Sequence, residues 1–320
     1  MTFAGSPTRS EARLVPDAGF EFDGFEVSGF PRRPGVALVR AVAQSVGAVR
    51  ACARILTARR PDVVLGGGGY VSGPMALAAA RRRIPTALLE ADAHLGLANR
   101  LAAPLARRVF LSFPIAGREG GKYRVTGRPI PARSRPVERA EARRRFDLPA
   151  DGPVLLVFGG SQGALRLNKL AVDAFGADGP LVLHLAGARD YPDLHSRVRR
   201  EEYRLLPFTD DFGAALGASD VALARAGGSV WELAAAGLPA VLVPYPSATA
   251  DHQTLNARHF ARGGGAVLVP ESELSAVPAL LRSLLDDDAK RAEMRAAMLR
   301  LARPDAAEEI AEELIALAHA

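Results

Sequence analysis

The feature that most constrains this chain is a repeated alternation of short apolar strands, glycine-bearing turns and helices. It is clearest late in the chain, where residues 220–224 (DVALA) predict a buried strand, 225–229 (RAGGS) a turn and 230–236 a helix. Gly237 then ends that helix, and a second strand is expected at 240–244. A strand that enters a glycine turn and then a helix N-terminus forms an anion site, because backbone N–H groups and the positive helix end point at the ligand.

The same alternation of strands and helices continues through the whole chain. Such alternation predicts parallel, doubly wound sheets. Strands are expected at 2–6, 19–27, 62–65, 85–90, 109–113, 123–127, 154–158, 181–186, 203–208, 221–224, 240–244 and 266–270. Long helical stretches are expected at 34–60, 271–302 and 305–318. We therefore expect an α/β protein with a first domain at 1–133, a second at 134–304, and a helix at 305–320 that packs back on the first.

Composition sets the outer limits. A chain of 320 residues suits two domains, and it contains no apolar run near the roughly 20 residues that cross a bilayer. The first residues lack a signal pattern, so we expect a cytoplasmic protein. The single cysteine, Cys52, and scattered histidines give no metal-ligand spacing, so no metal is expected. The net charge of +6 favours an anionic membrane or a phosphorylated substrate, and we expect no nucleic acid partner.

Two glycine turns in the second half indicate where phosphate binds. They are GGSQG at 159–163 and RAGGS at 225–229, each directly after a predicted strand. The first lacks the Lys-Ser/Thr ending of an ATP-binding P-loop, and neither is the G-x-G-x-x-G of dinucleotide sites. A dinucleotide cofactor and ATP hydrolysis are therefore disfavoured, and no cofactor is expected. Glu232 lies in the first turn of the following helix, where it faces the ligand or stabilises the helix end.

The amino-acid sequences of three segments closely resemble those of the MurG family. These segments are 225–256 (RAGGSVWELAAAGLPAVLVPYPSATADHQTLN), 159–168 (GGSQGALRLN) and 65–74 (LGGGGYVSGP). MurG enzymes move N-acetylglucosamine from UDP-N-acetylglucosamine to the undecaprenyl-diphosphate-linked muramoyl-pentapeptide, converting lipid I to lipid II. The resemblance covers nearly the whole chain. It implies the GT-B architecture, in which two Rossmann-like domains face each other across a cleft, and an inverting hexosyltransferase that works in peptidoglycan synthesis.

The resemblance also assigns roles to individual positions. Ser161 would bind the donor diphosphate, and the backbone of Thr209 would lie against the uracil. Glu232 would accept hydrogen bonds from the ribose hydroxyls, and Gln253 would contact the sugar ring. The phosphate turn would be lined by Gly228, Ser229 and Val230, with an uncertainty of one position because the turn is about one residue shorter than usual.

One departure from the family lies at the N-terminus. Family members begin with a strand and a G-G-T-G-G-H loop whose histidine is the favoured catalytic base, and this chain opens at what reads as the second strand. We expect the first strand and helix of the N-terminal domain to be missing, which would leave a gap in a central position of its sheet. The simplest explanation is that Met1 is an internal residue of a longer protein; the alternative is a shortened, inactive one. Catalysis by the chain as given is expected to be weak.

A second departure affects the acceptor side. The family pattern H-E-Q-N becomes 89–92 (LEAD), which keeps only Glu90 and places Asp92 in the loop that follows. Glu90 is then the remaining carboxylate for the catalytic base, or a cap of its own loop. The pattern N-P-V-R becomes 128–131 (RPIP), so Arg128 or Arg133 would have to replace the arginine. We expect Glu90, Asp92 and Arg128 to act on the substrates.

The acceptor implied by the resemblance is a polyprenyl-diphosphate lipid, so we expect peripheral binding to the cytoplasmic face of the cell membrane. Arg40, Arg50 and Arg54 share a face of the predicted helix at 34–60 and would contact anionic headgroups, unless they are only a solvated edge. Three alternatives remain open: a glycosyltransferase for another lipid acceptor, an inactive nucleotide-sugar-binding protein, and a UDP-sugar epimerase.

Overall fold

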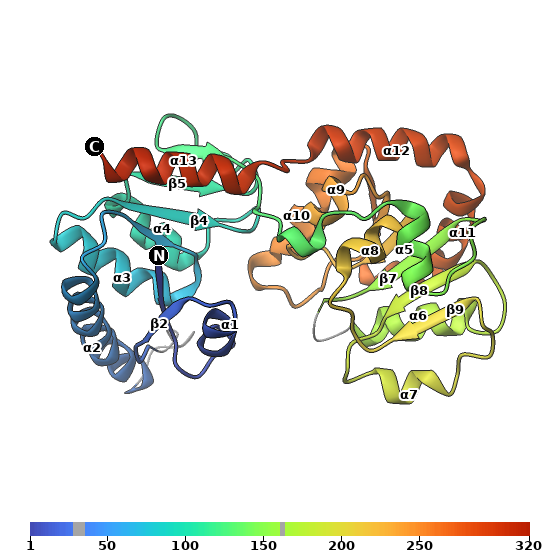
Figure 1. The fold of residues 1–320 in the computed structure, drawn as a ribbon, viewed down its shortest axis with the longest axis horizontal. Helices are drawn as coiled ribbons and strands as arrows, with labels where there is room; N and C mark the ends of the chain where they lie inside the picture. Colours follow the sequence, from blue (N-terminus) through green and yellow to red (C-terminus); the bar gives the residue numbers. More distant parts are fainter. Residues whose placement is uncertain (28–35, 161–163) are drawn as a thin grey trace. The chain divides into compact units, whose positions relative to one another are not determined.

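The computed structural model describes residues 1–27, 36–160 and 164–320, with side chains from 46 onward in the second helix. The chain divides into two compact units. Unit 1 comprises Met1–Thr126 and Glu308–Ala320, and unit 2 comprises Gly127–Ala307. The sequence placed these borders at 133/134 and 304/305, a few residues from where the contacts divide. Figure 1 shows both units as α/β structures.

Unit 2 is built on a six-stranded sheet in the order β12-β11-β10-β7-β8-β9, with every pair parallel. Its strands are β7 (Val154–Phe158), β8 (Leu181–Leu185), β9 (Tyr203–Leu206), β10 (Val221–Ala224), β11 (Ala240–Leu242) and β12 (Ala266–Leu268). Its helices are α5 (Arg139–Arg145), α6 (Leu165–Phe175), α7 (Tyr191–His195), α8 (Phe212–Gly217), α9 (Val230–Ala235), α10 (His252–Arg262), α11 (Val277–Asp286) and α12 (Asp288–Leu301). The parallel order confirms the doubly wound sheet expected for this half.

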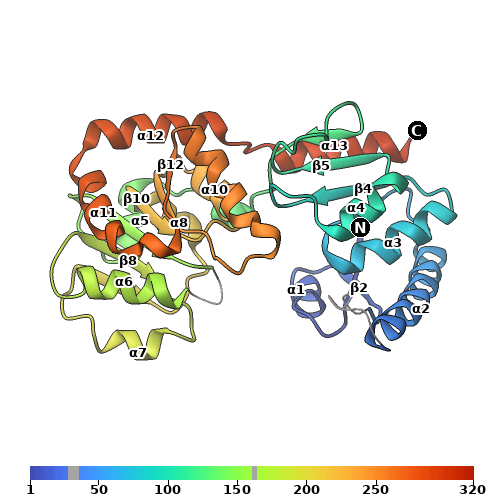
Figure 2. The ribbon, with the colours of Figure 1, turned by 180° about the vertical axis from the view of Figure 1, so that it is seen from behind.

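The core of unit 2 follows from the apolar runs of its strands. The five residues of β7 are all buried, as a strand covered on both faces requires. Leu155 and Val157 point to one face, where they pack in one cluster with residues of α6 and α11. Figure 2 shows these two helices. Burial of this cluster fixes the strand ends, and with them the turns that follow.

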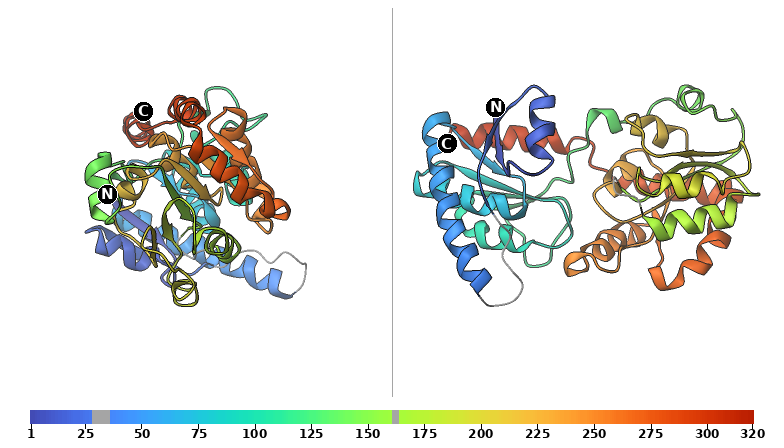
Figure 3. Two further views of the ribbon diagram at one scale, coloured as in Figure 1. Left: turned by 90° about the vertical axis from the view of Figure 1, so that its right-hand side faces the viewer. Right: turned by 90° about the horizontal axis from the view of Figure 1, so that it is seen from below.

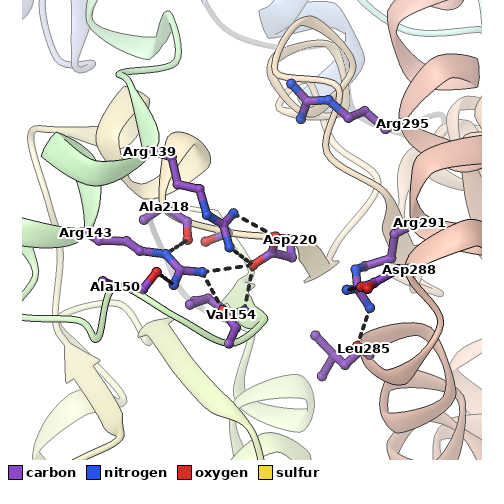
Figure 4. Close-up of polar contacts among 12 residues, drawn as sticks. Arg139, Arg143, Ala150, Val154, Ala218, Asp220, Leu285, Asp288, Arg291 and Arg295 are labelled. Carbon is purple, nitrogen blue, oxygen red and sulfur yellow. Dashed lines mark hydrogen bonds and ion pairs between the residues drawn. The ribbon is translucent and has the colours of Figure 1, made fainter.

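The amino ends of β7 and β10 are held by one carboxylate, Asp220 (Figure 4). Its Oδ2 accepts from the backbone N–H of Val154 at 2.8 Å and from Arg143 at 3.2 Å. Arg139 donates to both oxygens, at 2.7 and 3.1 Å. The Arg143 side chain is almost fully buried and also donates to backbone carbonyls of residues 149–152. These contacts therefore stabilise the amino edge of the sheet. The opposite, carboxyl edge remains available for ligands.

Unit 1 contains two parallel sheets, β1-β2 and β3-β4-β5-β6. Its strands are β1 (Thr2–Gly5), β2 (Glu21–Gly24), β3 (Val64–Gly66), β4 (Thr86–Glu90), β5 (Arg108–Leu111) and β6 (Tyr123–Val125). Its helices are α1 (Glu11–Asp17), α2 (Val36–Arg59), α3 (Gly69–Arg81), α4 (Leu97–Ala102) and α13 (Ala306–Ala318). Within the described residues no strand joins β1 to β3, as expected for a sheet that lacks its central strand.

Helices α2 and α3 pack against both sheets of unit 1 (Figure 3). Ala48, Cys52 and Leu56 form the buried face of α2, and Ala4 of β1 and Val64 of β3 pack against the same cluster. Val46, on the same helix, is 51% exposed. No helix among the described residues has the length and apolar character needed to cross a bilayer.

The last helix, α13, lies along β5 in Figure 1. Ile310 and Leu317 pack against Ala87 and Phe110, on one face of the four-stranded sheet. Glu313 accepts from Arg108 at 2.9 Å. The predicted return of this helix to the first half is therefore what the structure contains.

Candidate functional site

The strand order of unit 2 reverses between β7 and β10. From β7 the chain continues through β8 to β9, and from β10 through β11 to β12 on the other side. In open α/β sheets ligands bind at the carboxyl ends of the strands at such a point. The turns that leave β7 and β10 are the two glycine turns identified in the sequence, so the topology brings them to one place.

The turn after β7 depends on its glycines. A Cβ at Gly159 would collide with Ala164, and Gly160 has a φ of +89°, which L side chains rarely adopt. Ser161, the residue predicted to bind diphosphate, lies outside the described residues.

A cavity of about 280 Å³ opens at these strand ends. Three predicted residues line it: Thr209, Ser229 and Glu232. The rest of the wall is formed by Pro131, Arg133, Ser134, Phe158, Gly160, Leu185, Gly187, Pro207, Phe208, Asp210 and Phe212. A larger cavity of about 470 Å³ lies along β9 and contains none of the predicted residues. The smaller cavity is the candidate site because its wall joins the glycine turns to the only carboxylate that the sequence assigned to a ligand in this half.

Glu232 is half-buried in the first turn of α9. Among the described residues its carboxylate has no hydrogen bond or ion pair, whereas the buried carboxylates Asp190 and Glu271 of the same unit are paired with arginines. A partly desolvated carboxylate without a partner favours a ligand that donates hydrogen bonds, such as a diol. The structure therefore places Glu232 in the wall of the cavity, in the first turn of α9.

The turn after β10 presents unused backbone donors. The N–H groups of Gly228 and Ser229 have no acceptor among the described residues, and the Ser229 side chain does not cap α9. Val230 differs, because its side chain is fully buried and its N–H donates to Gly227 at 3.3 Å. Of the three residues predicted here, Gly228 and Ser229 present donors and Val230 supports the turn.

The Arg128 side chain lies against the turn after β10. A Cβ built at Gly228 would overlap the Arg128 guanidinium, so this group lies directly against the turn. It forms no ion pair or hydrogen bond with a described residue. The connector at 128–135 also supplies Pro131, Arg133 and Ser134 to the cavity. The two prolines of this segment, Pro129 and Pro131, restrict its backbone beside the cavity.

Gln253 lies at the start of α10, behind the loop that follows β11. Its Oε1 accepts from the backbone N–H of Tyr245 at 2.9 Å, which fixes the amide and leaves Nε2 as a donor. On the same helix, Asn256 is fully buried and donates to the carbonyl of Ala226 at 3.1 Å. The Asn256 bond connects α10 to the turn after β10, and the Gln253 bond connects it to the loop after β11.

In unit 1, Glu90 ends β4 and is 6% exposed. Its Oε2 accepts from the N–H of Gly96 at 2.8 Å and from Asn99 at 2.9 Å, and Oε1 accepts from the N–H of Asp92 at 3.3 Å. The carboxylate therefore holds the loop that carries Asp92, which is half-buried. This matches the alternative role of Glu90 as a cap of its own loop.

A buried polar network supports the helix behind the first glycine turn. Asn168 of α6 donates to Ala186 at 2.8 Å and to Asp190 at 3.0 Å, and its Oδ1 lies 3.0 Å from Nε2 of His184. Nε2 must then carry the proton, and Nδ1 accepts from the Tyr203 hydroxyl at 2.8 Å. Burial lowers the pKa of His184 to about 3, so the ring stays neutral.

Comparison with known proteins agrees with this arrangement. The model of the glycosyltransferase family 28 N-terminal domain matches residues 2–111, and that of the family 28 C-terminal domain matches residues 154–310. One match lies in each unit, and the second includes both glycine turns and Glu232.

Curated relatives cover nearly the whole chain. The UDP-N-acetylglucosamine–N-acetylmuramyl-(pentapeptide) pyrophosphoryl-undecaprenol N-acetylglucosamine transferase of Salinibacter ruber is 41% identical, over 99% of this chain and 88% of the relative. The enzyme of the same name from Halothermothrix orenii is 35% identical, over 95% and 87%. The crystal structure of Acinetobacter baumannii MurG is similar with a TM-score of 0.77 and 27% identity, over 98% of this chain and 90% of that one.

Proposed function

Because this chain belongs to the MurG family of N-acetylglucosamine transferases, we propose that it transfers N-acetylglucosamine from UDP-N-acetylglucosamine to an undecaprenyl-diphosphate-linked muramoyl-pentapeptide. The reaction would convert lipid I to lipid II in peptidoglycan synthesis. The observation that carries this proposal is the cavity at the switch point of unit 2, where an unpaired carboxylate adjoins a turn with unused N–H groups.

The cavity suits the nucleoside of the donor. Glu232 would accept from the two ribose hydroxyls, and the backbone of Thr209 would face the uracil. The Thr209 hydroxyl is already used, since it accepts from the N–H of Asp211 at 3.1 Å, so its loop is fixed. Phe208 is 61% exposed in the cavity wall, where an aromatic ring can stack on a planar base.

The diphosphate would lie on the turn after β10. Its negative charge grows as the sugar leaves, and donors that are already in place stabilise that charge without reorganisation. The N–H groups of Gly228 and Ser229 supply neutral donors, and Arg128 supplies a cation beside them. We propose that Ser161 binds the same group from the first turn and that Gln253 contacts the sugar through Nε2. No metal is needed for these contacts.

The acceptor hydroxyl has to lose a proton to a base. We propose Glu90 for this step and Asp92 as an acceptor contact, on the evidence that Glu90 ends a parallel strand at the edge where ligands bind. The three hydrogen bonds to Glu90 give it a structural role as well, and the variant described in the Discussion separates the two roles.

We also propose that unit 1 binds peripherally to the cytoplasmic face of the membrane that contains the lipid acceptor. Arg50 and Arg54 are exposed on α2, which supports this proposal. The side chain of Arg40, the third residue of the predicted basic face, lies outside the described residues.

Replacing Glu232 tests the donor assignment. Glu232→Ala removes the acceptor of the ribose hydroxyls, so UDP binding should weaken by about 1.5–3 kcal/mol, the usual contribution of a hydrogen bond to a charged group. Calorimetry on the full chain with UDP measures this, with and without a chelator.

The matched control is Glu273→Ala, which removes an exposed carboxylate of unit 2 outside the cavity. It should leave UDP affinity unchanged. Equal affinity of the parent and Glu232→Ala, or loss of binding on chelation, would contradict the donor assignment.

A further inference from the structure

Glu271 is a buried carboxylate that the proposed reaction does not use. It begins the short helix η4 (Glu271–Ala276), three residues after β12, and its side chain is 8% exposed. It does not line the donor cavity. A buried charge requires compensation, and the groups that compensate this one show what it does.

Glu271 pairs with two arginines from different parts of the sheet. Oε2 forms an ion pair with Arg225, whose side chain is 10% exposed. Oε1 accepts from Arg166 at 2.9 Å, and that side chain is 69% exposed. The attraction between Glu271 and Arg225 is therefore little screened by water. The attraction between Glu271 and Arg166 is screened by solvent and is weaker.

Each arginine is attached to one of the phosphate turns. Arg225 is the first residue after β10 and opens the turn that contains Gly228 and Ser229. Arg166 is the second residue of α6, the helix that follows the turn after β7. One carboxylate thus connects the backbone on both sides of the switch point.

Among the described residues, Glu271 is the only carboxylate that pairs with Arg225. Its Nη1 donates to the carbonyls of Val243 and Pro244, both at 3.1 Å, and its guanidinium lies 5.5 Å from the centre of the Tyr245 ring. Tyr245 in turn donates its N–H to Gln253. Without Glu271 the Arg225 charge would be buried and uncompensated, so the side chain would shift and move the start of the turn.

We infer that Glu271 is a positioning residue for the donor diphosphate. It holds Arg225, and more weakly Arg166, so that the N–H groups of the turn after β10 and the start of α6 face one ligand. It does not touch that ligand. The inference rests on the proposed function, because it assigns the diphosphate to this turn.

The test compares UDP with uridine on the full chain by calorimetry. Glu271→Gln keeps the size of the side chain and one acceptor oxygen but removes the charge. We expect the Kd for UDP to rise about tenfold, the effect of losing one charge-assisted interaction, while the Kd for uridine stays within about twofold. Glu271→Asp, which keeps the charge, should recover part of the UDP affinity. Arg166→Ala should raise the Kd for UDP by less than Glu271→Gln does.

Asp220→Asn is the matched control, because it weakens a buried arginine–carboxylate network at the opposite edge of the same sheet (Figure 4). It should lower the Tm without changing the ratio of the two Kd values. The inference is overturned if Glu271→Gln binds UDP as the parent does, if UDP and uridine weaken equally, or if Asp220→Asn changes the ratio as much. A parent that binds neither ligand contradicts the proposed function as well as the inference; an unchanged Glu271→Gln variant of a parent that binds UDP contradicts only the inference.

Discussion

At the scale of single residues, the site depends on which polar groups are left without a partner in the protein. Most charged side chains of unit 2 are used internally, as in the contacts of Asp220 with Arg139 and Arg143. Glu232 and Arg128 are exceptions among the described residues, and both adjoin the turn after β10. Their opposite charges suit a ligand that has hydroxyl donors at one end and phosphates at the other.

The buried His184 should make the folded protein less stable as the pH falls. The unfolded chain takes up a proton near pH 6.5, whereas folded His184 does not until about pH 3, so the unfolded state binds more protons in this window. Stability should therefore fall as the pH falls from 6.5 toward 3, by up to about 1.4 kcal/mol per pH unit from this group. Denaturant unfolding at several pH values measures the slope.

The variant His184→Gln should reduce that slope by about one proton, whatever its effect on stability at pH 7. His319→Gln, which replaces an exposed histidine, should leave the slope nearly unchanged. An unaltered slope in the His184 variant would show that the ring is not the group responsible.

Glu90→Gln distinguishes the two roles of this residue. Replacing one carboxylate oxygen by an NH₂ group removes an acceptor from the N–H of Gly96, the Asn99 amide or the N–H of Asp92. The anchor role predicts a loss of about 1–3 kcal/mol in unfolding free energy. The base role predicts a fall of about 10²–10⁴-fold in kcat with an unchanged KM for the donor. Full transfer activity in this variant would end the assignment as base.

Residue positions that follow a strand end could be predicted from the sequence, because a parallel sheet brings such ends to one edge. Thr209, Ser229 and Glu232 are of this kind, and all three line the cavity. Arg128 could not be placed in this way. It reaches Gly228 across 100 positions, and no local pattern records such an approach.

At the scale of secondary-structure elements, the apolar strands were predicted well because their burial gives a strong pattern. The range 154–158 coincides with β7, and 221–224 coincides with β10. Short helices such as α5, α7 and α8 were not predicted, since five to seven residues give too little periodicity. No helix was predicted in the glycine-rich segment 65–74, but α3 begins at Gly69 and continues through Pro74. Tertiary packing of its small residues, Ala76, Ala78 and Ala79, outweighs the poor helix propensity.

The membrane proposal belongs to α2. Replacing Arg50 and Arg54 by alanine should weaken binding to vesicles that contain anionic lipid by about 1 kcal/mol per residue, and added salt should remove the difference. Flotation of the full chain with such vesicles measures this. Arg199 and Arg258 are exposed in unit 2 and provide a matched double variant that should float like the parent. If the α2 variant also floats like the parent, α2 is only solvated surface.

At the scale of the whole molecule, the two units differ in their sheets. Among the described residues, unit 2 has one continuous sheet, and unit 1 has two separate sheets. Unit 2 has six continuous parallel strands and contains the cavity. In unit 1 the edge strand β3 leaves Leu65 40% exposed, and β1 leaves Phe3 38% exposed. The predicted borders at 133/134 and 304/305 lie within a few residues of the observed division at 126/127 and 307/308.

The central claim is that UDP-N-acetylglucosamine binds at the carboxyl edge of the unit 2 sheet, between the turns after β7 and β10. A crystal structure of the full chain with this ligand tests it most directly. We predict the ribose hydroxyls within hydrogen-bond distance of Glu232, the uracil beside the backbone of Thr209, and the diphosphate on the N–H groups of Gly228 and Ser229. Density for the nucleotide at another place, such as the cavity along β9, with the Glu232 carboxylate still without a partner, would contradict the account.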